Sequence, residues 1–488
     1  MAFRPDDGRR RRPRTGKDGG AKDQKGRRGS GKSGAPRAGV RTSAGVQTRL
    51  AAADLIFRVM DQGADLETAF EASESFDALT GPDRGFARAI ASAALRGLGR
   101  IDYALGAMLD RPLADIEPPV RALLRAGAAQ LWTMGVADHA AVSSTVEAAR
   151  AWPEASKGGG LINAVLRRAA RETEVFAQSP LTAIWPDWLA ARLKSALGPA
   201  RADALARLQL EDPPVDLTLK AGADLAGWAT RLGGEVLPGG SIRLPSGAGL
   251  TELPGYAEGD WWVQDAAAAI PARLLGDLHG RSVIDLCAAP GGKALQLASQ
   301  GAGLIAIDIS AQRLMLLREN AGRTQLPMRI LEADARTWRP DALADAVLLD
   351  APCSALGTLR RHPEGAWRRD PQGLARYPAI QARLLEAAGG MLKPGGQLIY
   401  CVCTPLREEG ADIVAQALAS GDWRRRPVAS GELPGLGHAL TDEGDVLSAP
   451  PADGHDSLSR VENVSAAHQS DSAVLMSDVF YIARLERT

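Results

Sequence analysis

The stretch Ser282-Val-Ile-Asp-Leu-Cys-Ala-Ala-Pro-Gly-Gly-Lys293 decides the fold of the largest part of the chain. Its apolar run predicts a buried β-strand, because it is short and is bounded by Arg281 and Pro290. A helical pattern of apolar residues begins at Lys293. A strand that leads through glycines into a helix N-terminus brings backbone N–H groups close to a nucleotide-like ligand. An ordinary strand-to-helix connection has the same pattern, so this stretch alone leaves both interpretations open.

After this stretch, strands and helices alternate as in an α/β domain with a parallel sheet. Further strands are expected at residues 304–308, 328–334, 344–353 and 397–403. Three of them end at or contain Asp308, Asp334 and Asp350, with Cys353 and Cys403 beside them. Ligands of an open parallel sheet bind at the carboxyl ends of its strands. One such carboxylate is usually a turn former, but its recurrence on successive strands indicates a site.

The spacing of these residues favours a nucleoside ligand. Asp308 follows the glycine loop by about 15 residues, where a carboxylate can accept hydrogen bonds from both hydroxyls of a ribose. Asp334 is placed to accept a hydrogen bond from an adenine amino group. No Walker lysine-serine pair follows the glycines, which disfavours a nucleoside triphosphate.

This arrangement resembles the class I S-adenosylmethionine-dependent methyltransferases. Three motifs, Cys287-Ala-Ala-Pro-Gly-Gly-Lys293, Asp350-Ala-Pro-Cys-Ser354 and Tyr400-Cys-Val-Cys-Thr404, are similar to those of the RNA 5-methylcytosine methyltransferases. The resemblance implies a Rossmann-like α/β domain with a mostly parallel seven-stranded sheet and S-adenosylmethionine as cofactor. The residues that it implies for cofactor binding are Cys287, Ala288, Ala289, Pro290, Gly291, Gly292, Lys293, Asp308, Arg313, Asp334 and Asp350.

The same resemblance assigns roles to two cysteines and one aspartate. Carbon 5 of cytosine becomes nucleophilic enough to accept a methyl group once a thiolate has added to carbon 6. The family pattern implies Cys403 as this nucleophile, Cys353 as the residue that helps to release the product, and Asp350 as a hydrogen-bond partner of the base. DNA cytosine methyltransferases place their nucleophile in a Pro-Cys like Pro352-Cys353, but the presence of Cys403 favours the RNA type. Cys401 is expected on the opposite face of the strand, in the core.

Residues 46–175 have apolar residues at helical spacing throughout, which predicts a small all-α bundle. The runs Asp83-Arg-Gly-Phe-Ala-Arg88, Leu131–Val142 and Leu161–Arg168 resemble the NusB-type RNA-binding bundles. A bundle of this type in front of the catalytic motifs is similar to the RsmB (Sun/Fmu) family, which implies 16S ribosomal RNA or a small-subunit precursor as the partner. Arg167 and Arg168 are candidate phosphate contacts.

A basic segment follows the Asp350 motif and contains an aromatic residue. Arg360, Arg361 and Trp367 lie in this segment, 358–369, and are candidates for gripping the RNA backbone and stacking a base. A solvated loop is an equally good interpretation. A target cytosine must leave its helix or lie in a loop, so a flipped or single-stranded base is expected.

The predicted organisation has four parts. They are a disordered basic tail at 1–44, the NusB-like bundle at 46–175, a connector and small α/β subdomain at 179–275, and the methyltransferase domain at 276–488 with an insertion around 445–470. Two features depart from the family pattern. The first strand of the subdomain, Val215-Asp-Leu-Thr-Leu-Lys220, lacks the usual Arg-x-Asn motif, and the last strand lacks a glycine after Asp478.

Composition limits the classes of function. The 58 basic and 58 acidic residues balance overall, but residues 1–44 contain 14 basic and 4 acidic residues, which suits a polyanion-binding or merely solubilising tail. No apolar run predicts secretion or a membrane span, and no CxxC pair predicts zinc, so we expect a cytoplasmic, metal-free monomer. Two other functions stay open: an RNA-binding factor without turnover, and a methyltransferase that acts on an exocyclic amine.

Overall fold

The computed structural model describes residues 43–245, 247, 249–451 and 477–488. The predicted basic tail lies outside the described residues except for positions 43 and 44, and the predicted insertion is described only up to residue 451. Within the described ranges, no helix is long and apolar enough to cross a membrane.

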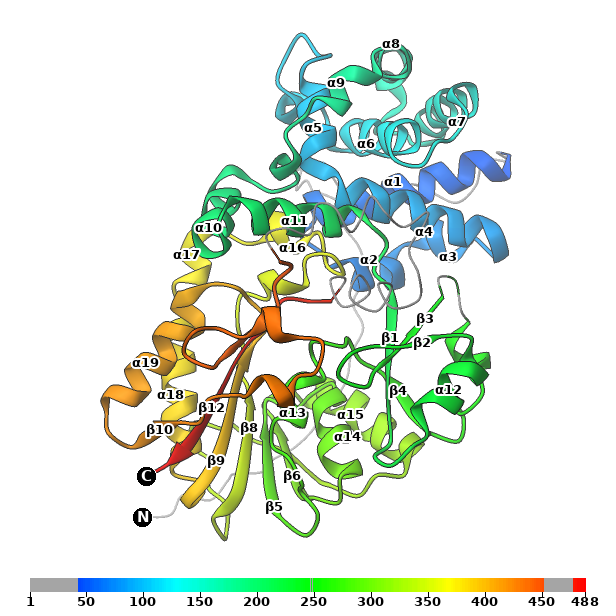
Figure 1. The fold of residues 1–488 in the computed structure, drawn as a ribbon. Coiled ribbons are helices and arrows are strands. Elements are labelled where there is room, and N and C mark those ends of the chain that lie inside the picture. The colour runs from blue at the N-terminus through cyan, green and yellow to red at the C-terminus, as the bar shows by residue number, and fades with distance from the viewer. Residues whose placement is uncertain (1–42, 246, 248, 452–476) are drawn as a thin grey trace, which may run out of the picture. The chain divides into compact units, whose positions relative to one another are not determined.

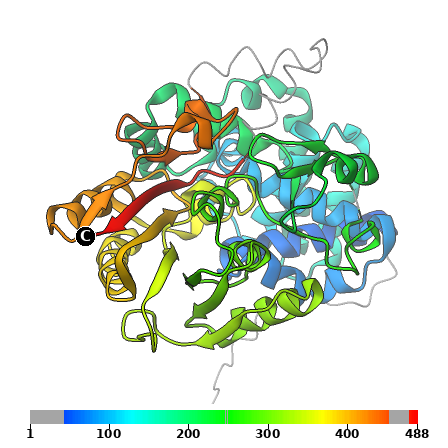
Figure 2. The same cartoon turned by 60° about the horizontal axis from the view of Figure 1, so that its bottom comes forward.

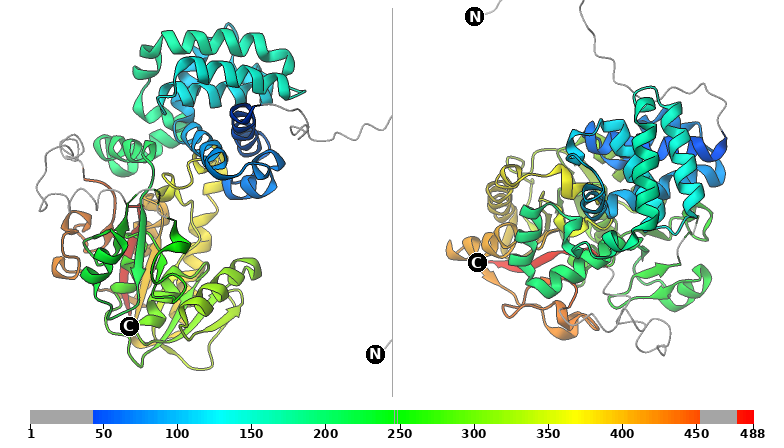
Figure 3. Two further views of the ribbon diagram at one scale, coloured as in Figure 1. Left: turned by 90° about the vertical axis from the view of Figure 1, so that its right-hand side faces the viewer. Right: turned by 90° about the horizontal axis from the view of Figure 1, so that it is seen from above.

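The first part of the described chain is built of helices, as predicted. They are α1 (Ala44–Asp61), α2 (Leu66–Ala72), α3 (Glu74–Asp77), α4 (Gly81–Arg96), α5 (Leu98–Gly106), α6 (Pro118–Trp132), α7 (Asp138–Ala151), α8 (Gly159–Arg171) and α9 (Thr173–Ala177). Most of these helices contribute apolar side chains to one core and form one bundle (Figure 3). Gly127 lets α6 and α8 pack closely, because a Cβ at this position of α6 would lie 2.4 Å from Cδ1 of Leu166 on α8.

Three helices and a small antiparallel sheet follow the bundle. These elements are α10 (Asp187–Leu197), α11 (Pro199–Leu210), α12 (Leu225–Leu232), β1 (Val215–Leu219), β2 (Glu235–Val236), β3 (Ile242–Leu244) and β4 (Trp261–Val263). The strand order is β2-β3-β1-β4. Nε of Arg243 on β3 lies 2.7 Å from Oδ1 of Asp216 on β1, and both side chains are buried. This pair gives the polar residue of the atypical first strand a structural partner within the sheet.

A large, mostly parallel sheet forms the centre of the last part, which confirms the predicted fold class. Its strands are β5 (Ser282–Leu286), β6 (Gly303–Asp308), β7 (Arg329–Glu332), β8 (Ala344–Asp350), β9 (Leu392–Val402), β10 (Trp423–Arg425), β11 (Val446–Leu447) and β12 (Tyr481–Arg487). Seven strands run in the order β10-β12-β9-β8-β5-β6-β7, and β11 pairs with β12. The strands from β9 to β7 are parallel, whereas β12 lies antiparallel between β9 and β10 (Figure 2).

Helices cover both faces of this sheet, which explains the continuous apolar runs of its central strands. The helices are α13 (Ile270–Arg273), α14 (Gly292–Ser299), α15 (Ala311–Thr324), α18 (Tyr377–Gly389) and α19 (Ala411–Ala419). Two short helices, α16 (Gly365–Arg368) and α17 (Pro371–Leu374), pack instead in a cluster with α10 and α11. One core cluster joins α13, α14 and α15 to the sheet, and another joins α18 and α19 to its opposite face (Figure 1). The carboxyl ends of the parallel strands therefore lie between two helical layers.

Strand β9 starts earlier than the sequence predicts. It begins at Leu392, before the expected strand at 397–403, and includes the Lys393-Pro-Gly-Gly396 segment. The register to β8 shifts here, because Ala344 pairs with Leu392 while Ala346 pairs with Gln397. The glycines thus form an irregularity within the strand.

Candidate active site

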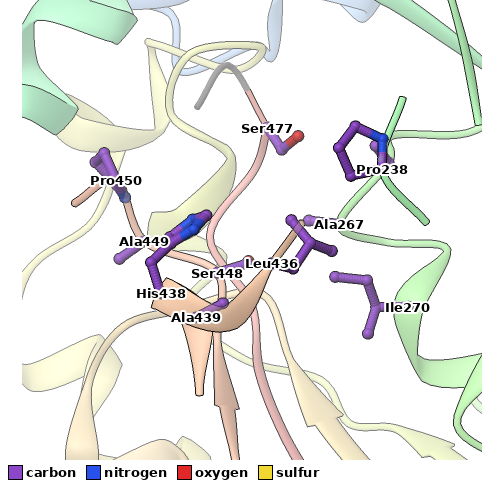
Figure 4. Close-up of a pocket in the computed structure, with 11 residues that line it drawn as sticks. Pro238, Ala267, Ile270, Leu436, His438, Ala439, Ser448, Ala449, Pro450 and Ser477 are labelled. Carbon is purple, nitrogen blue, oxygen red and sulfur yellow. The ribbon is translucent and has the colours of Figure 1, made fainter. Parts of the chain in front are cut away.

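A cleft of about 380 Å³ lies at the carboxyl ends of the parallel strands, where the sequence predicts a ligand site. Seven of the predicted site residues line it together: Cys287, Asp308, Arg313, Asp334, Asp350, Cys353 and Cys403. This volume falls within the range of small-molecule sites. Another cavity, lined by residues such as Pro238, Ile270 and His438, measures only about 20 Å³ and has room for about one water molecule (Figure 4). The cleft is the candidate active site because it brings the predicted site residues together.

The glycine loop between β5 and α14 forms the base of the cleft. Cys287 has a φ of 62° and Gly291 a φ of 118°, and the peptide bond between Ala289 and Pro290 is cis. A Cβ at position 291 would lie 2.4 Å from Cδ1 of Leu317 on α15. Glycine is required at position 291 for two reasons, the positive φ and the packing of α15 against the loop.

Asp308, at the end of β6, is almost fully buried and hydrogen-bonded to the glycine loop. Its Oδ2 accepts from the backbone N–H of Ala289 at 3.1 Å, and its Oδ1 accepts from that of Ser310 at 3.0 Å. Nη1 of Arg313 lies 3.1 Å from Oδ2 of Asp308, and the same guanidinium donates to the carbonyl of Ala289. Asp308 thus also holds the loop in shape, a role that the sequence interpretation did not include.

Asp334 follows β7, and its side chain is partly exposed. Its Oδ2 lies 2.6 Å from Nη2 of Arg336, and this contact lowers the pKa of Asp334. Both residues line the cleft. An adenine amino group at this position would share the carboxylate with Arg336.

Asp285, in the middle of β5, is a charged residue that the sequence reasoning missed. It is fully buried, and neither of its carboxylate oxygens has a hydrogen-bond partner among the described residues. Burial, with the negative charge of Asp350 nearby, raises its pKa well above the usual value. The sequence did contain a signal for this residue, namely an acidic side chain inside the apolar run Val283–Leu286. A buried carboxylate without a partner costs free energy, so its presence there indicates a functional role.

Lys293, at the start of α14, pairs with Asp350 at the end of β8. Its Nζ lies 2.8 Å from Oδ2 of Asp350 and 4.8 Å from the centre of the Phe480 ring. Burial disfavours the charged lysine, but the charge and hydrogen bond of Asp350, together with the nearby Cys401 and Cys403, outweigh burial and raise the pKa of Lys293. The sequence interpretation placed Lys293 among the cofactor-binding residues. The structure gives it a carboxylate partner.

The two predicted catalytic cysteines are in contact. Sγ of Cys353, after β8, lies 3.4 Å from Sγ of Cys403, after β9, within hydrogen-bonding distance for sulfur. This contact, together with burial, raises the pKa of Cys403 well above the usual value. In the ligand-free site Cys403 is therefore a neutral thiol.

The other two cysteines lie close to the same site. Burial raises the pKa of Cys287 to about 12, in agreement with an unreactive packed thiol. Cys401 is fully buried, as predicted, but the prediction that it faces away from Cys403 is wrong, because residues two apart on a strand face the same side. Both pack against the same core cluster, and the Cys401 thiol donates to Oδ1 of Asp350 at 3.5 Å.

The basic segment after Cys353 does not present the arginines that we expected to contact RNA. Arg360 is 2 % exposed and pairs with both Asp265 and Asp478, and Arg361 pairs with the same two carboxylates. Trp367 packs partly buried against a core cluster. These three side chains join segments of the fold to one another, because carboxylates and apolar neighbours from distant parts of the chain surround them.

The helical bundle places its two candidate RNA contacts differently. Arg167 is exposed, donates to Oδ1 of Asn163 at 3.0 Å and lines an open groove between α7 and α8 that also includes His139. Nε of Arg168 lies 2.9 Å from Oε2 of Glu172 one turn along α8. Arg167 is therefore the better placed of the two to meet a phosphate.

Comparisons with known proteins identify the family. Residues 272–458 match the family model described as 16S rRNA methyltransferase RsmB/F, and residues 46–171 match the NusB family. The chain is 37% identical over 406 residues to ribosomal RNA small subunit methyltransferase B of Xanthomonas campestris pv. campestris, covering 80% of this chain and 91% of the relative. The chain belongs to the RsmB family of 16S rRNA methyltransferases. This membership confirms the predicted family, the NusB-like bundle and S-adenosylmethionine as cofactor.

Other relatives agree with this result. The methyltransferase B of Erwinia tasmaniensis is 33% identical over 387 residues, covering 76% of this chain and 89% of the relative. The crystal structure of PH0851 superimposes with a TM-score of 0.69 at 21% identity, covering 91% of this chain and 99% of that one. The structure of NSun6 from Pyrococcus horikoshii gives a TM-score of 0.50 at 19% identity, covering 62% and 98%. At these identities the two structures support the RsmB-family fold alone.

Proposed function

We propose that this RsmB-family methyltransferase methylates carbon 5 of a cytosine in 16S rRNA through a covalent adduct on Cys403. The observation that carries the proposal is the contact of the Cys353 and Cys403 sulfurs, 3.4 Å apart, in a cleft that also contains Asp350. Two adjacent thiols at one base-sized site suit a reaction in which one adds to the ring and the other completes the elimination.

The cysteines act in sequence on the cytosine. The thiol of Cys403 loses its proton and its sulfur bonds to carbon 6, which moves electron density to carbon 5. S-adenosylmethionine supplies an electrophilic methyl group that carbon 5 then attacks. Cys353, as thiolate, removes the proton from carbon 5, and the bond between carbon 6 and Cys403 breaks to restore the aromatic ring. The proton of the Cys403 thiol passes to solvent when the adduct forms. At the end Cys353 holds the proton of carbon 5 and Cys403 leaves as a thiolate, so transfer of that proton between the two sulfurs, 3.4 Å apart, restores both residues. One proton is released for each methyl group transferred.

Asp350 and Lys293 set the charge around the base. Asp350 lies at the end of β8 and lines the cleft. Its Oδ2 lies 2.8 Å from Nζ of Lys293. A hydrogen bond from the base to Asp350 would stabilise the charge that develops at the ring during attack. Lys293 holds the Asp350 carboxylate in place, because its Nζ lies 2.8 Å from Oδ2 of Asp350.

The residues of the cleft fit S-adenosylmethionine. Its sulfonium and ammonium groups are cationic, and Asp308 and Asp350 line the cleft. Asp285, buried in β5 with a raised pKa, is a further carboxyl that a bound cation would favour in its ionised form. Asp285 supplies the decisive observation, because it is a buried carboxylate with no partner among the described residues. Asp308 and Asp334 would hold the ribose and the adenine, and the loop from Cys287 to Lys293 would contact the cofactor through its backbone.

The RNA must present an unstacked cytosine to this cleft. The NusB-like bundle is the proposed RNA-binding region, with the exposed Arg167 as its first candidate contact. Arg168 is a second candidate, although Glu172 offsets its charge. A cytosine that lies in a loop, or that is flipped out of its helix, could enter the cleft.

The test is a trapping assay with tritiated S-adenosylmethionine and unmethylated 16S rRNA. Wild type should transfer label to the RNA, Cys403→Ala should transfer none, and Cys353→Ala should accumulate a protein–RNA adduct because release fails. The two variants serve as mutual controls, since both remove one thiol from the same contact. Adduct with Cys403→Ala but none with Cys353→Ala would reverse the assignment. No transfer by wild type to RNA or to small-subunit particles would favour an RNA-binding factor without turnover.

A further inference from the structure

Glu409 is a buried acidic residue to which the proposed mechanism gives no role. It lies at the end of a short 3-10 turn, Arg407–Glu409, that follows β9 and Cys403. Its side chain is 1 % exposed and lies outside the cleft. Burial raises its pKa, and the hydrogen bonds from Ser354 and Gln381 oppose that rise. Burying a carboxylate costs free energy, and hydrogen bonds must compensate for the water that it loses.

The hydrogen bonds of Glu409 hold the loop that contains Cys353. Oε2 of Glu409 accepts from the backbone N–H of Ser354 at 2.7 Å and from Nε2 of Gln381 at 3.1 Å. The same Nε2 of Gln381 donates to the carbonyl of Pro352 at 3.0 Å. The residues on both sides of Cys353 are therefore fixed by one pair of buried side chains.

A second set of contacts joins this loop to the residues around Cys403. The hydroxyl of Ser354 lies 3.0 Å from that of Thr404, and the backbone N–H of Gly357 donates to the carbonyl of Cys403 at 2.9 Å. Cys403 itself directly follows β9, which is paired on both sides with β8 and β12. Cys403 thus has a rigid strand behind it, whereas Cys353 depends on the loop that Glu409 and Gln381 hold.

We propose that Glu409 is a positioning residue that sets Cys353 against the adduct formed on Cys403. The inference rests on the proposed function, because it assumes the covalent step. Its consequence is specific to one half of the reaction. Loss of Glu409 leaves Cys403 on its strand and frees the Cys353 loop, so adduct formation continues while proton removal and release become slow.

The chain offers a matched control in the preceding residue. Glu408 has the same charge, but its side chain is 42 % exposed, and its Oε1 lies 3.3 Å from Nη1 of Arg192. Glu408→Ala removes one carboxylate at the same turn without touching the Cys353 loop. Glu409→Gln keeps one acceptor oxygen for Ser354 and is the conservative variant.

The experiment is a single-turnover assay of the full chain with tritiated S-adenosylmethionine and unmethylated 16S rRNA, in which adduct and released methylated RNA are measured separately. Glu409→Ala should form adduct within about threefold of the wild-type rate and release it about 100-fold more slowly, the size of effect that a displacement of about 1 Å produces. Glu409→Gln should recover much of the release rate, and Glu408→Ala should match wild type in both steps.

Three results would overturn the proposal. They are normal release by Glu409→Ala, equal slowing of both steps, and a release defect in Glu408→Ala as large as that in Glu409→Ala. Cys353→Ala is run in parallel and accumulates adduct if the proposed function is correct. Accumulation there with normal release by Glu409→Ala refutes only the role of Glu409. Absence of adduct from Cys353→Ala and wild type refutes the covalent mechanism itself.

Discussion

Nζ of Lys293 and Oδ2 of Asp350 are 2.8 Å apart, at a point where the first turn of α14 meets the end of β8. The lysine side chain is 10% exposed and the aspartate side chain 31%. This contact ties the glycine loop to the strand that leads to Cys353, so the loop proposed to bind the cofactor and the carboxylate proposed to contact the base share one ion pair.

Replacing Lys293 by methionine should therefore affect both stability and turnover. The variant leaves Asp350 without its buried partner and should lose about 1–3 kcal/mol of unfolding free energy. The double variant Lys293→Met/Asp350→Asn should lose less than the two single changes together, because each single change leaves the other group unpaired. Urea denaturation of the four proteins measures this. Strict additivity of the two losses would show that the pair is not coupled.

Asp285 predicts a dependence of cofactor binding on pH. The pKa of Asp285 is higher in the folded protein than in the unfolded chain. The folded protein therefore loses stability as pH rises from the usual pKa of an aspartate to the raised pKa of Asp285, because the unfolded chain ionises first. The cationic groups of S-adenosylmethionine favour the ionised form, so binding should release a proton and strengthen with rising pH. Calorimetry in two buffers of different ionisation enthalpy measures the proton.

Asp285→Asn is the matched variant for that experiment. It should bind the cofactor more weakly and release no proton, while the ligand-free protein should lose less stability than wild type as pH rises. Equal proton release by wild type and variant would assign the titration to another group.

The contact of the two sulfurs predicts the reactivity of Cys403. The Cys353 thiol is the largest cause of the raised pKa of Cys403, ahead of burial. Alkylation of Cys403 by iodoacetamide, followed by mass spectrometry, should accelerate as pH rises, because only the thiolate reacts. In Cys353→Ala the same curve should move to lower pH. An unchanged curve would mean that the 3.4 Å contact has no effect on the ionisation of Cys403.

Arg360 is expected to act on stability and not on RNA affinity. Its guanidinium lies between Asp265 and Asp478, and its replacement by alanine leaves two buried carboxylates without this partner. Arg360→Ala should lose about 3–5 kcal/mol of unfolding free energy. Arg368→Ala, at an exposed position of α16, should lose almost none. The salt dependence of RNA binding by folded Arg360→Ala should equal that of wild type, and a reduced slope would indicate a phosphate contact.

Much of the fold and of the site was predictable because the signals are local. The strand, the glycine loop and the helix that follows all lie within Ser282–Ser299, and the structure has them there. Asp308 and Asp350 were placed correctly at strand ends, since the carboxyl ends of parallel strands share one edge.

The errors have physical causes. Arg360 lies 95 residues from Asp265 and 118 from Asp478 along the chain, and a basic loop shows no sign of such distant partners. The face of Cys401 was predictable from the two-residue period of a strand, and the error was one of reasoning. Asp285 was overlooked because its apolar neighbours made the whole run resemble core. Glu409 is recognisable only through Ser354 and Gln381, which the fold brings to it.

The position of β12 has a consequence for the folding of the chain during its synthesis on the ribosome. β12 comes after all other strands of the large sheet in the chain, yet it lies between β9 and β10. During synthesis from the N-terminus, β9 can pair with β8 on one side, but its other side has no partner strand until Tyr481–Arg487 have emerged. The strand that leads to Cys403 therefore completes its pairing after every other strand of the large sheet has been synthesised.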